Sequence, residues 1–90
     1  MYHARIISTE FKSREDLEVA TAAWKEWYPE NMPTPLSRYI VRTGEKLTMM
    51  TSVYESEDLL NQAQLAAAEW WKIYGHHVYE TIVFDGPVID

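Results

Sequence analysis

Two helical segments, each opened by a serine, constrain the fold of this chain more than any other feature. The first predicted helix follows Ser13 and carries one apolar stripe at helical spacing, made of Leu17, Ala20, Trp24, Trp27 and Tyr28. The second follows Ser56 and carries two neighbouring apolar stripes. Serine is a favoured N-cap, and the acidic residues behind each serine suit the helix dipole. We expect the first helix to stop at Pro29 and the second to end at a left-handed Gly75.

Runs of β-forming residues surround these helices, at 2–11, 37–43, 47–54 and 76–84. Only Gly44, Glu45 and Lys46 separate the second and third runs, which predicts a hairpin. A turn is expected at 85–87. The element order is therefore β-α-β-β-α-β in a single domain of residues 1–90. Right-handed crossovers would place both helices on one face of a four-stranded antiparallel sheet, which is the ferredoxin-like α+β arrangement.

The face of this sheet opposite the helices must meet either water or a partner. In the runs 2–11 and 47–54 both alternating sets of residues are partly apolar, so the sequence leaves open which set faces the helices. Neither set is as polar as a hydrated sheet face. We therefore predict a homodimer in which two copies of the chain pack sheet against sheet.

Charge and cysteine content narrow the class of partner. The chain has 90 residues, with 14 acidic and 8 basic side chains and a formal charge of −6. Such a surface repels phosphate groups, which argues against nucleic acid and against anionic membranes as partners. Cysteine is absent, and neither a signal-peptide pattern nor a membrane-spanning run occurs. A cytoplasmic location is the expectation that fits these features.

Over residues 2–84 the chain resembles the dimeric α/β-barrel superfamily, in which two ferredoxin-like subunits pack sheet against sheet. The resemblance rests on length, element order and the broad aromatic second helix, which ends in the run 70–75. The superfamily includes cofactor-independent monooxygenases, haem-degrading monooxygenases and muconolactone isomerases, so membership selects no single chemistry. The haem-degrading branch places an Asn on its first strand. The asparagines here are Asn31 and Asn61, and we therefore carry over no haem site.

The candidate ligand-binding residues lie on the first strand and near the end of the second helix; they are His3, Arg5, Trp70, Trp71, Tyr74 and His77. The aromatic members could line a pocket between helices and sheet, although core and dimer packing is the interpretation that we favour for them. If 76–84 is a strand, His76 and His77 point to opposite faces and do not share a metal. We predict no metal and no cofactor, and we identify no catalytic residue.

A further pair of basic residues has two interpretations. Arg38 and Arg42 are four residues apart, so they share one face of a predicted strand. They could clamp an anionic ligand inside a barrel. Alternatively, they could keep a solvated edge strand from pairing with other chains.

Three functions are compatible with these features. The favoured one is a homodimer that binds a small apolar or aromatic molecule, or that serves only as an assembly module. The alternative is a cofactor-independent monooxygenase or isomerase, in which Trp70 or Trp71 positions an aromatic substrate and His3 or His77 handles a proton. A third is an interaction protein that docks a larger partner on an exposed aromatic face.

Overall fold

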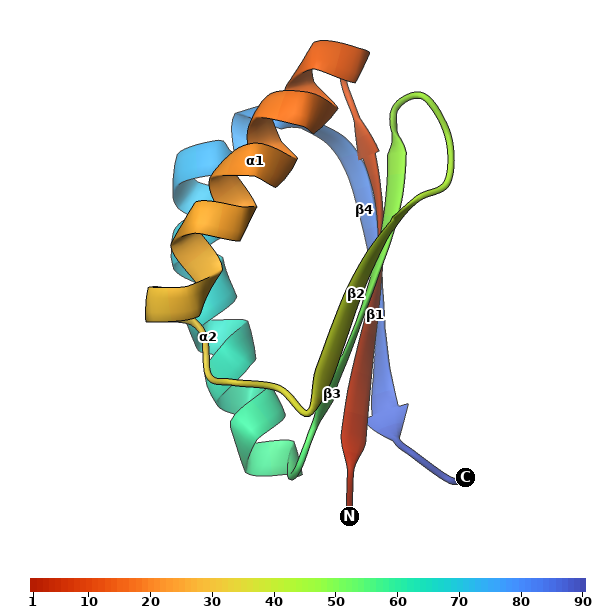
Figure 1. Cartoon of the computed structure of the whole chain (residues 1–90), viewed down its shortest axis with the longest axis vertical. Helices are drawn as coiled ribbons and strands as arrows, with labels where there is room; N and C mark the ends of the chain where they lie inside the picture. Colours follow the sequence, from red (N-terminus) through yellow and green to blue (C-terminus); the bar gives the residue numbers. More distant parts are fainter.

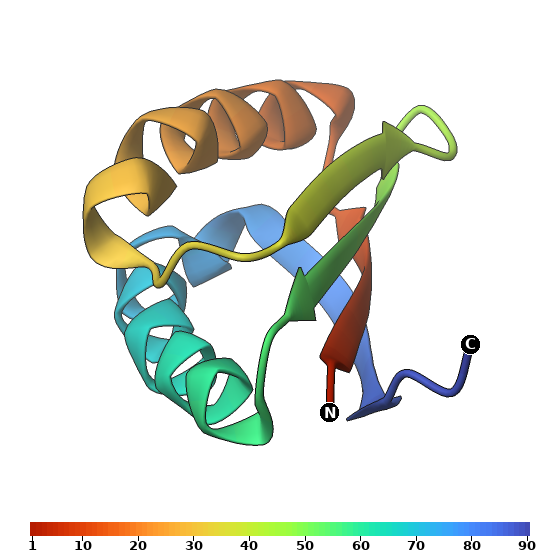
Figure 2. The same cartoon turned by 60° about the horizontal axis from the view of Figure 1, so that its bottom comes forward.

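Strands and helices follow one another along the chain in the predicted order β-α-β-β-α-β (Figure 1). The computed structural model describes all residues from 1 to 90. Its elements are β1 (His3–Phe11), α1 (Arg14–Asn31), β2 (Ser37–Arg42), β3 (Leu47–Tyr54), α2 (Glu57–Tyr74), the 3₁₀ turn η1 (Gly75–His77) and β4 (Val78–Pro87). The strands form one antiparallel sheet in the order β2-β3-β1-β4. Both helices cover the same face of this sheet (Figure 2), which is the predicted ferredoxin-like arrangement.

Both helices begin where the sequence predicts, because each start is determined by contacts within one turn. The side-chain oxygen of Ser13 accepts a hydrogen bond from the backbone N–H of Asp16 at 3.0 Å. The side-chain oxygen of Ser56 accepts one from the N–H of Leu59 at 3.2 Å. Each serine therefore satisfies one of the N–H groups that a helix start leaves without a backbone partner.

The predicted stop of α1 at Pro29 is wrong, because the helix continues through the proline to Asn31. Pro29 has no backbone N–H to donate within the helix, but two hydrogen bonds to backbone carbonyls hold the last turn together. The N–H of Met32 donates to the carbonyl of Tyr28 at 2.9 Å, and the side-chain amide of Asn31 donates to the carbonyl of Trp27 at 2.7 Å. One missing bond in the last turn is therefore tolerated.

The predicted left-handed Gly75 and the start of the last strand are also wrong. Gly75 is right-handed (φ −61°, ψ −21°) and continues as a 3₁₀ turn, so β4 begins at Val78. The strand then runs through 85–87, where we expected a turn, because β1 pairs with it: Arg5 lies opposite Asp85 and His3 opposite Pro87. A proline is tolerated there because β4 is an edge strand.

Strand register determines which sheet face is buried. The helix-facing set of β3 contains Thr48, Ser52 and Tyr54, all buried, and Tyr54 is only 2% exposed. Antiparallel pairing places Arg5 of β1 opposite Ser52, so residues 5, 7, 9 and 11 share this buried face. No helix of the structure has the length and apolar character that crossing a bilayer requires.

The opposite face of the sheet, here called the outer face, is covered by no other element (Figure 1). It presents large apolar side chains from all four strands, among them Ile6, Tyr39, Val41, Met49, Ile82 and Phe84. These six side chains are between 37% and 67% exposed. An apolar area that spans a whole sheet face is unusual for a surface in contact with water alone.

Candidate functional site

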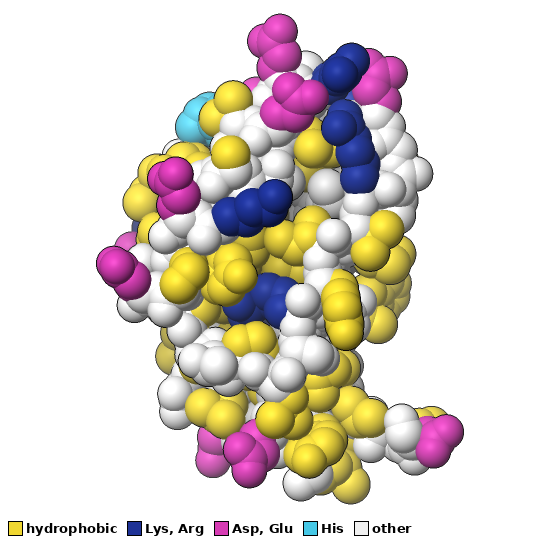
Figure 3. Space-filling model, viewed as in Figure 1, with side chains coloured by type: hydrophobic (Ala, Val, Ile, Leu, Met, Phe, Trp, Pro, Cys, Tyr) yellow, Lys and Arg dark blue, Asp and Glu magenta, His cyan; other side chains and the backbone are white.

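A cavity lies between the two helices and the sheet. Its volume is about 80 Å³, and 14 of its 19 lining residues are hydrophobic. The lining comes from every helix and strand, which explains why no single sequence segment marks it. Figure 3 shows hydrophobic side chains gathered around a hollow between the helices and β2, with one group of basic atoms inside it.

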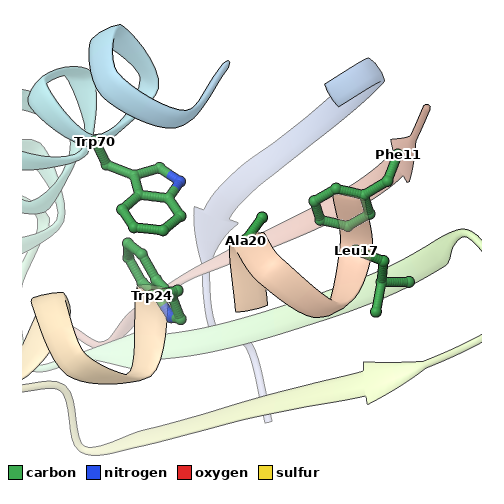
Figure 4. Close-up of a cluster of buried hydrophobic side chains, with 5 residues drawn as sticks. All are labelled: Phe11, Leu17, Ala20, Trp24 and Trp70. Atoms are coloured by element: carbon green, nitrogen blue, oxygen red, sulfur yellow. The ribbon is translucent and has the colours of Figure 1, made fainter. Parts of the chain in front are cut away.

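Aromatic rings from both helices form one wall of the cavity. Trp24 of α1 and Trp70 of α2 meet edge to face, with ring centroids 5.2 Å apart (Figure 4). Trp70 also stacks on Tyr74 at 4.1 Å. Edge-to-face and offset-stacked arrangements are the favoured geometries of aromatic pairs. The wall is therefore held by ring contacts between helices that are far apart in sequence.

Four of the six predicted site residues lie in the cavity lining: Arg5, Trp70, Trp71 and Tyr74. Trp70 is buried, whereas Trp71 and Tyr74 are half-buried. Arg5 comes from β1 and has a carboxylate partner: its Nη2 donates to Asp85 Oδ2 at 3.1 Å and to Gln64 Oε1 at 2.9 Å. The charge of Arg5 is therefore compensated within the chain.

The structure separates the two predicted histidines from the cavity lining. The ring of His3 donates through Nδ1 to the carbonyl of Met1 at 3.2 Å, and its Nε2 lies 3.7 Å from Glu57 Oε2. His76 and His77 stand in η1 rather than in a strand, so their rings lie together at 4.0 Å instead of on opposite faces. The structure assembles no group of three His, Cys, Asp or Glu side chains with metal-binding geometry.

His77 instead connects η1 to the start of α1. Its Nδ1 donates to Asp16 Oδ1 at 2.7 Å, and Ser13 Oγ donates to the other carboxylate oxygen at 2.7 Å. The hydrogen bond from His77, followed by that from Ser13, lowers the pKa of Asp16 below its ordinary value. These contacts are structural and lie outside the cavity.

Three residues outside the predicted ligand-binding set contribute polar atoms to this region: Trp24, Arg38 and Tyr54. Trp24 was assigned to the core from its helical spacing, which is correct, but its indole nitrogen is buried without a hydrogen-bond partner. Arg38 points toward the cavity wall and hydrogen-bonds to Tyr54 OH at 2.7 Å. No sequence signal distinguishes Arg38 from Arg42, because both lie on the same strand face.

Arg42 has a different environment. Its guanidinium donates to the backbone carbonyls of Gly44 and Glu45 at 3.1 and 2.7 Å, so it closes the β2–β3 hairpin. The cavity lining contains no Asp or Glu, and its one charged member is Arg5. In a chain with a formal charge of −6, the cavity is thus a region without negative side chains.

Comparisons with known proteins identify the fold. No protein-family model and no curated protein sequence matches the chain. A dimeric ferredoxin-like protein from an uncultured marine organism superposes with a TM-score of 0.81 at 15% identity, over 99% of this chain and 89% of that one. SnoaB, a cofactor-independent oxygenase from Streptomyces nogalater, gives 0.76 at 7% identity, over 99% and 94%.

A protein of Chloroflexus aurantiacus, provisionally named as an antibiotic biosynthesis monooxygenase, gives a TM-score of 0.77 at 13% identity, over 98% of this chain and 94% of that one. Identities this low establish the fold and leave the activity open. The fold expected from the resemblance is therefore confirmed: this chain has the ferredoxin-like α+β fold that these three proteins share.

Proposed function

We propose that this chain forms a homodimer through the outer face of its sheet and binds a small aromatic molecule in the cavity between sheet and helices. The observation that carries the binding proposal is the lining itself. Apolar and aromatic walls with a few polar groups are the usual composition of small-molecule sites.

The cavity volume limits the size of the ligand. The cavity has a volume of about 80 Å³. An engineered protein cavity of about 150 Å³ accepts benzene. A ligand with one aromatic ring therefore fits after a modest outward movement of side chains such as Trp71 and Tyr74, which are half-buried.

Titration with benzyl alcohol and with its saturated counterpart, cyclohexylmethanol, tests the binding proposal. We expect benzyl alcohol to quench or shift tryptophan fluorescence saturably, and cyclohexylmethanol to bind more weakly. Trp70→Leu should weaken binding. Trp27→Leu is the matched control. The ring centroid of Trp27 lies 5.7 Å from that of Trp70, but Trp27 does not line the cavity. If the protein is a dimer but binds neither compound, the result would favour the alternative that it serves only as an assembly module.

The outer face supports the homodimer. Its apolar side chains lie on all four strands, and a second copy of the same face would remove them from water. The monomer has a mass of 10.6 kDa. Light scattering should give twice that value, 2 × 10.6 = 21.2 kDa. A mass of one chain at micromolar concentration would contradict the proposed assembly.

A second candidate function is cofactor-independent oxygenation of the bound aromatic molecule. It is favoured by the similarity of the fold to a protein named as a cofactor-independent oxygenase. In such a reaction the substrate itself is the reductant: a phenol loses two hydrogen atoms, one oxygen atom of O₂ enters the quinone product, and the other leaves as water with those two hydrogens. The titratable side chains in the lining are Arg5, Tyr54 and Tyr74, so a proton-handling group would be sought among these tyrosines rather than at His3 or His77.

An oxygen electrode tests this second candidate. Phenols that bind in the fluorescence titration should show oxygen uptake in proportion to the concentration of protein. The rate should fall in Trp70→Leu and persist in Trp27→Leu. If no bound phenol consumes oxygen above the rate of the buffer, the oxygenase candidate is excluded and the binding proposal stands.

A further inference from the structure

Arg38 lies behind the cavity lining and contacts two residues that form it, Ser52 and Tyr54. It stands on the helix-facing side of β2, opposite Ser52 in the sheet register. Its Nε donates to Ser52 Oγ at 3.1 Å and its Nη2 donates to Tyr54 OH at 2.7 Å. Both of these partners line the cavity. The guanidinium is therefore held at the cavity wall by two neutral hydroxyl groups.

No carboxylate compensates this charge. The other two strand arginines each have one: Arg5 pairs with Asp85 at 3.1 Å, and Arg42 lies 4.0 Å from Glu18. Arg38 forms no ion pair. Its guanidinium carbon lies instead 4.8 Å from the ring centre of Tyr28 and 5.6 Å from that of Trp24. Aromatic faces stabilise a cation only partly, and a poorly hydrated charge without an opposite charge is unfavourable.

Three buried hydrogen-bond donors have no acceptor: Nε of Arg5, Nη1 of Arg38 and Nε1 of Trp24. Arg5 already has a carboxylate partner in Asp85, whereas the guanidinium of Arg38 lies beside the Trp24 ring without one. Trp24 is 7% exposed. Its ring nitrogen is at the end turned away from Trp70, on the side of the strands (Figure 4). Buried polar atoms almost always have partners, so the unpaired donors of Arg38 and Trp24 call for an explanation.

We infer that Arg38 and Trp24 anchor an anionic oxygen of the molecule that occupies the cavity. The inference rests on the proposed small-molecule function and specifies its ligand class: a one-ring aromatic compound with a carboxylate or phenolate group. The oxygen accepts from Arg38 Nη1 and Trp24 Nε1, and its charge compensates the guanidinium. The lining contains no Asp or Glu that would form an ion pair with a cationic ligand instead.

Benzoate and benzamide test this assignment, because they share one shape and differ in charge. We expect calorimetry at pH 7 to show benzoate binding about tenfold more tightly than benzamide, the ratio typical of one charge-assisted hydrogen bond. In Arg38→Met the affinity for benzoate should fall by about tenfold and that for benzamide by less than about twofold. Arg42→Met is the control on the same strand face and should leave both affinities unchanged.

Trp24→Phe gives an independent test, because it keeps an aromatic ring, although a smaller one, and removes the donor. It should weaken benzoate binding by roughly three- to tenfold and leave benzamide unchanged. In the native protein the Trp24 indole N–H resonance, assigned with this variant, should move downfield with benzoate. Equal affinities for both compounds, unaffected by Arg38→Met and Trp24→Phe, would overturn the anchor and leave the cavity as an aromatic site. Failure of both compounds and of benzyl alcohol to bind would overturn the proposed function and the anchor together.

Discussion

His77 Nδ1 lies 2.7 Å from Asp16 Oδ1 and so joins the turn after α2 to the first turn of α1. The two residues are 61 positions apart in the sequence, and the contact connects the two β-α halves of the chain at one end. Ser13, which caps α1, donates to the same carboxylate. One side chain therefore participates in both a local helix start and a long-range contact.

This relationship predicts a pH dependence of stability. The pKa of Asp16 is lowered in the folded protein from its ordinary value of 3.8. Its contribution to the free energy of unfolding is therefore complete above about pH 4 and decreases as pH falls toward the folded-state pKa. Urea unfolding of native protein and Asp16→Asn should show a stability difference at pH 7 that shrinks below pH 4.

Glu15→Gln is the matched control for this experiment, because it removes a neighbouring carboxylate of the same turn that has no contact with His77. We expect the stability of this variant to stay close to the native value at pH 7. An Asp16→Asn difference that is constant from pH 7 to pH 2.5 would contradict the assigned role of the ionised carboxylate.

The hydrogen bond between Arg38 and Tyr54 predicts strong coupling between these residues. Tyr54→Phe removes the acceptor of Arg38 Nη2 and adds to the unpaired donors of a charged group, so it should destabilise the native protein by about 1–3 kcal/mol. In an Arg38→Met background the same substitution removes a hydroxyl that has lost its partner, and its cost should fall to about zero. A double-mutant cycle by urea unfolding measures the difference, and additive effects would refute the coupling.

The outer face predicts a substitution that separates the subunits. Met49 lies on β3 between its neighbours Val41 and Ser8 and is 41% exposed. Met49→Asp should convert the dimer to a monomer of unchanged helix content, since it places a charge in an apolar contact. Light scattering and circular dichroism check this. Leu65→Asp is the control, because the Leu65 side chain of α2 is 74% exposed and lies away from the outer face of the sheet. It should leave the dimer intact.

The passage of α1 through Pro29 predicts a stabilising substitution. Pro29→Ala would restore a backbone donor in the last turn of the helix, and we expect a gain of about 1 kcal/mol in thermal or urea unfolding. Pro33→Ala, in the connector before β2, should instead destabilise by about 0.4–1 kcal/mol, because it only frees the unfolded chain. Equal effects at both positions would show that the helix carries no penalty from Pro29.

The wrong predictions at Gly75 and at residues 85–87 have one physical origin. Gly75 favours a left-handed helix end in isolation, but here the chain continues in a right-handed turn that presents His77 to Asp16. The same holds for 85–87, whose turn-forming composition is overridden by pairing with β1. Local preferences of this kind are worth about 1 kcal/mol, and contacts with distant residues outweigh them.

The amino-acid sequence by itself determined the element order and the two helix starts, because the caps at Ser13 and Ser56 and the helical spacing of apolar residues depend on neighbours within one or two turns. Four of the predicted ligand-binding residues, Arg5, Trp70, Trp71 and Tyr74, line one cavity, and their role in binding stays a prediction. Only the tertiary structure decided which sheet face is buried, because this depends on the register between strands far apart in the chain, and a shift of one residue would exchange the two faces. It also decided the different partners of Arg38 and Arg42, which share one strand face: Arg38 lies beside Tyr54, and Arg42 lies at the hairpin.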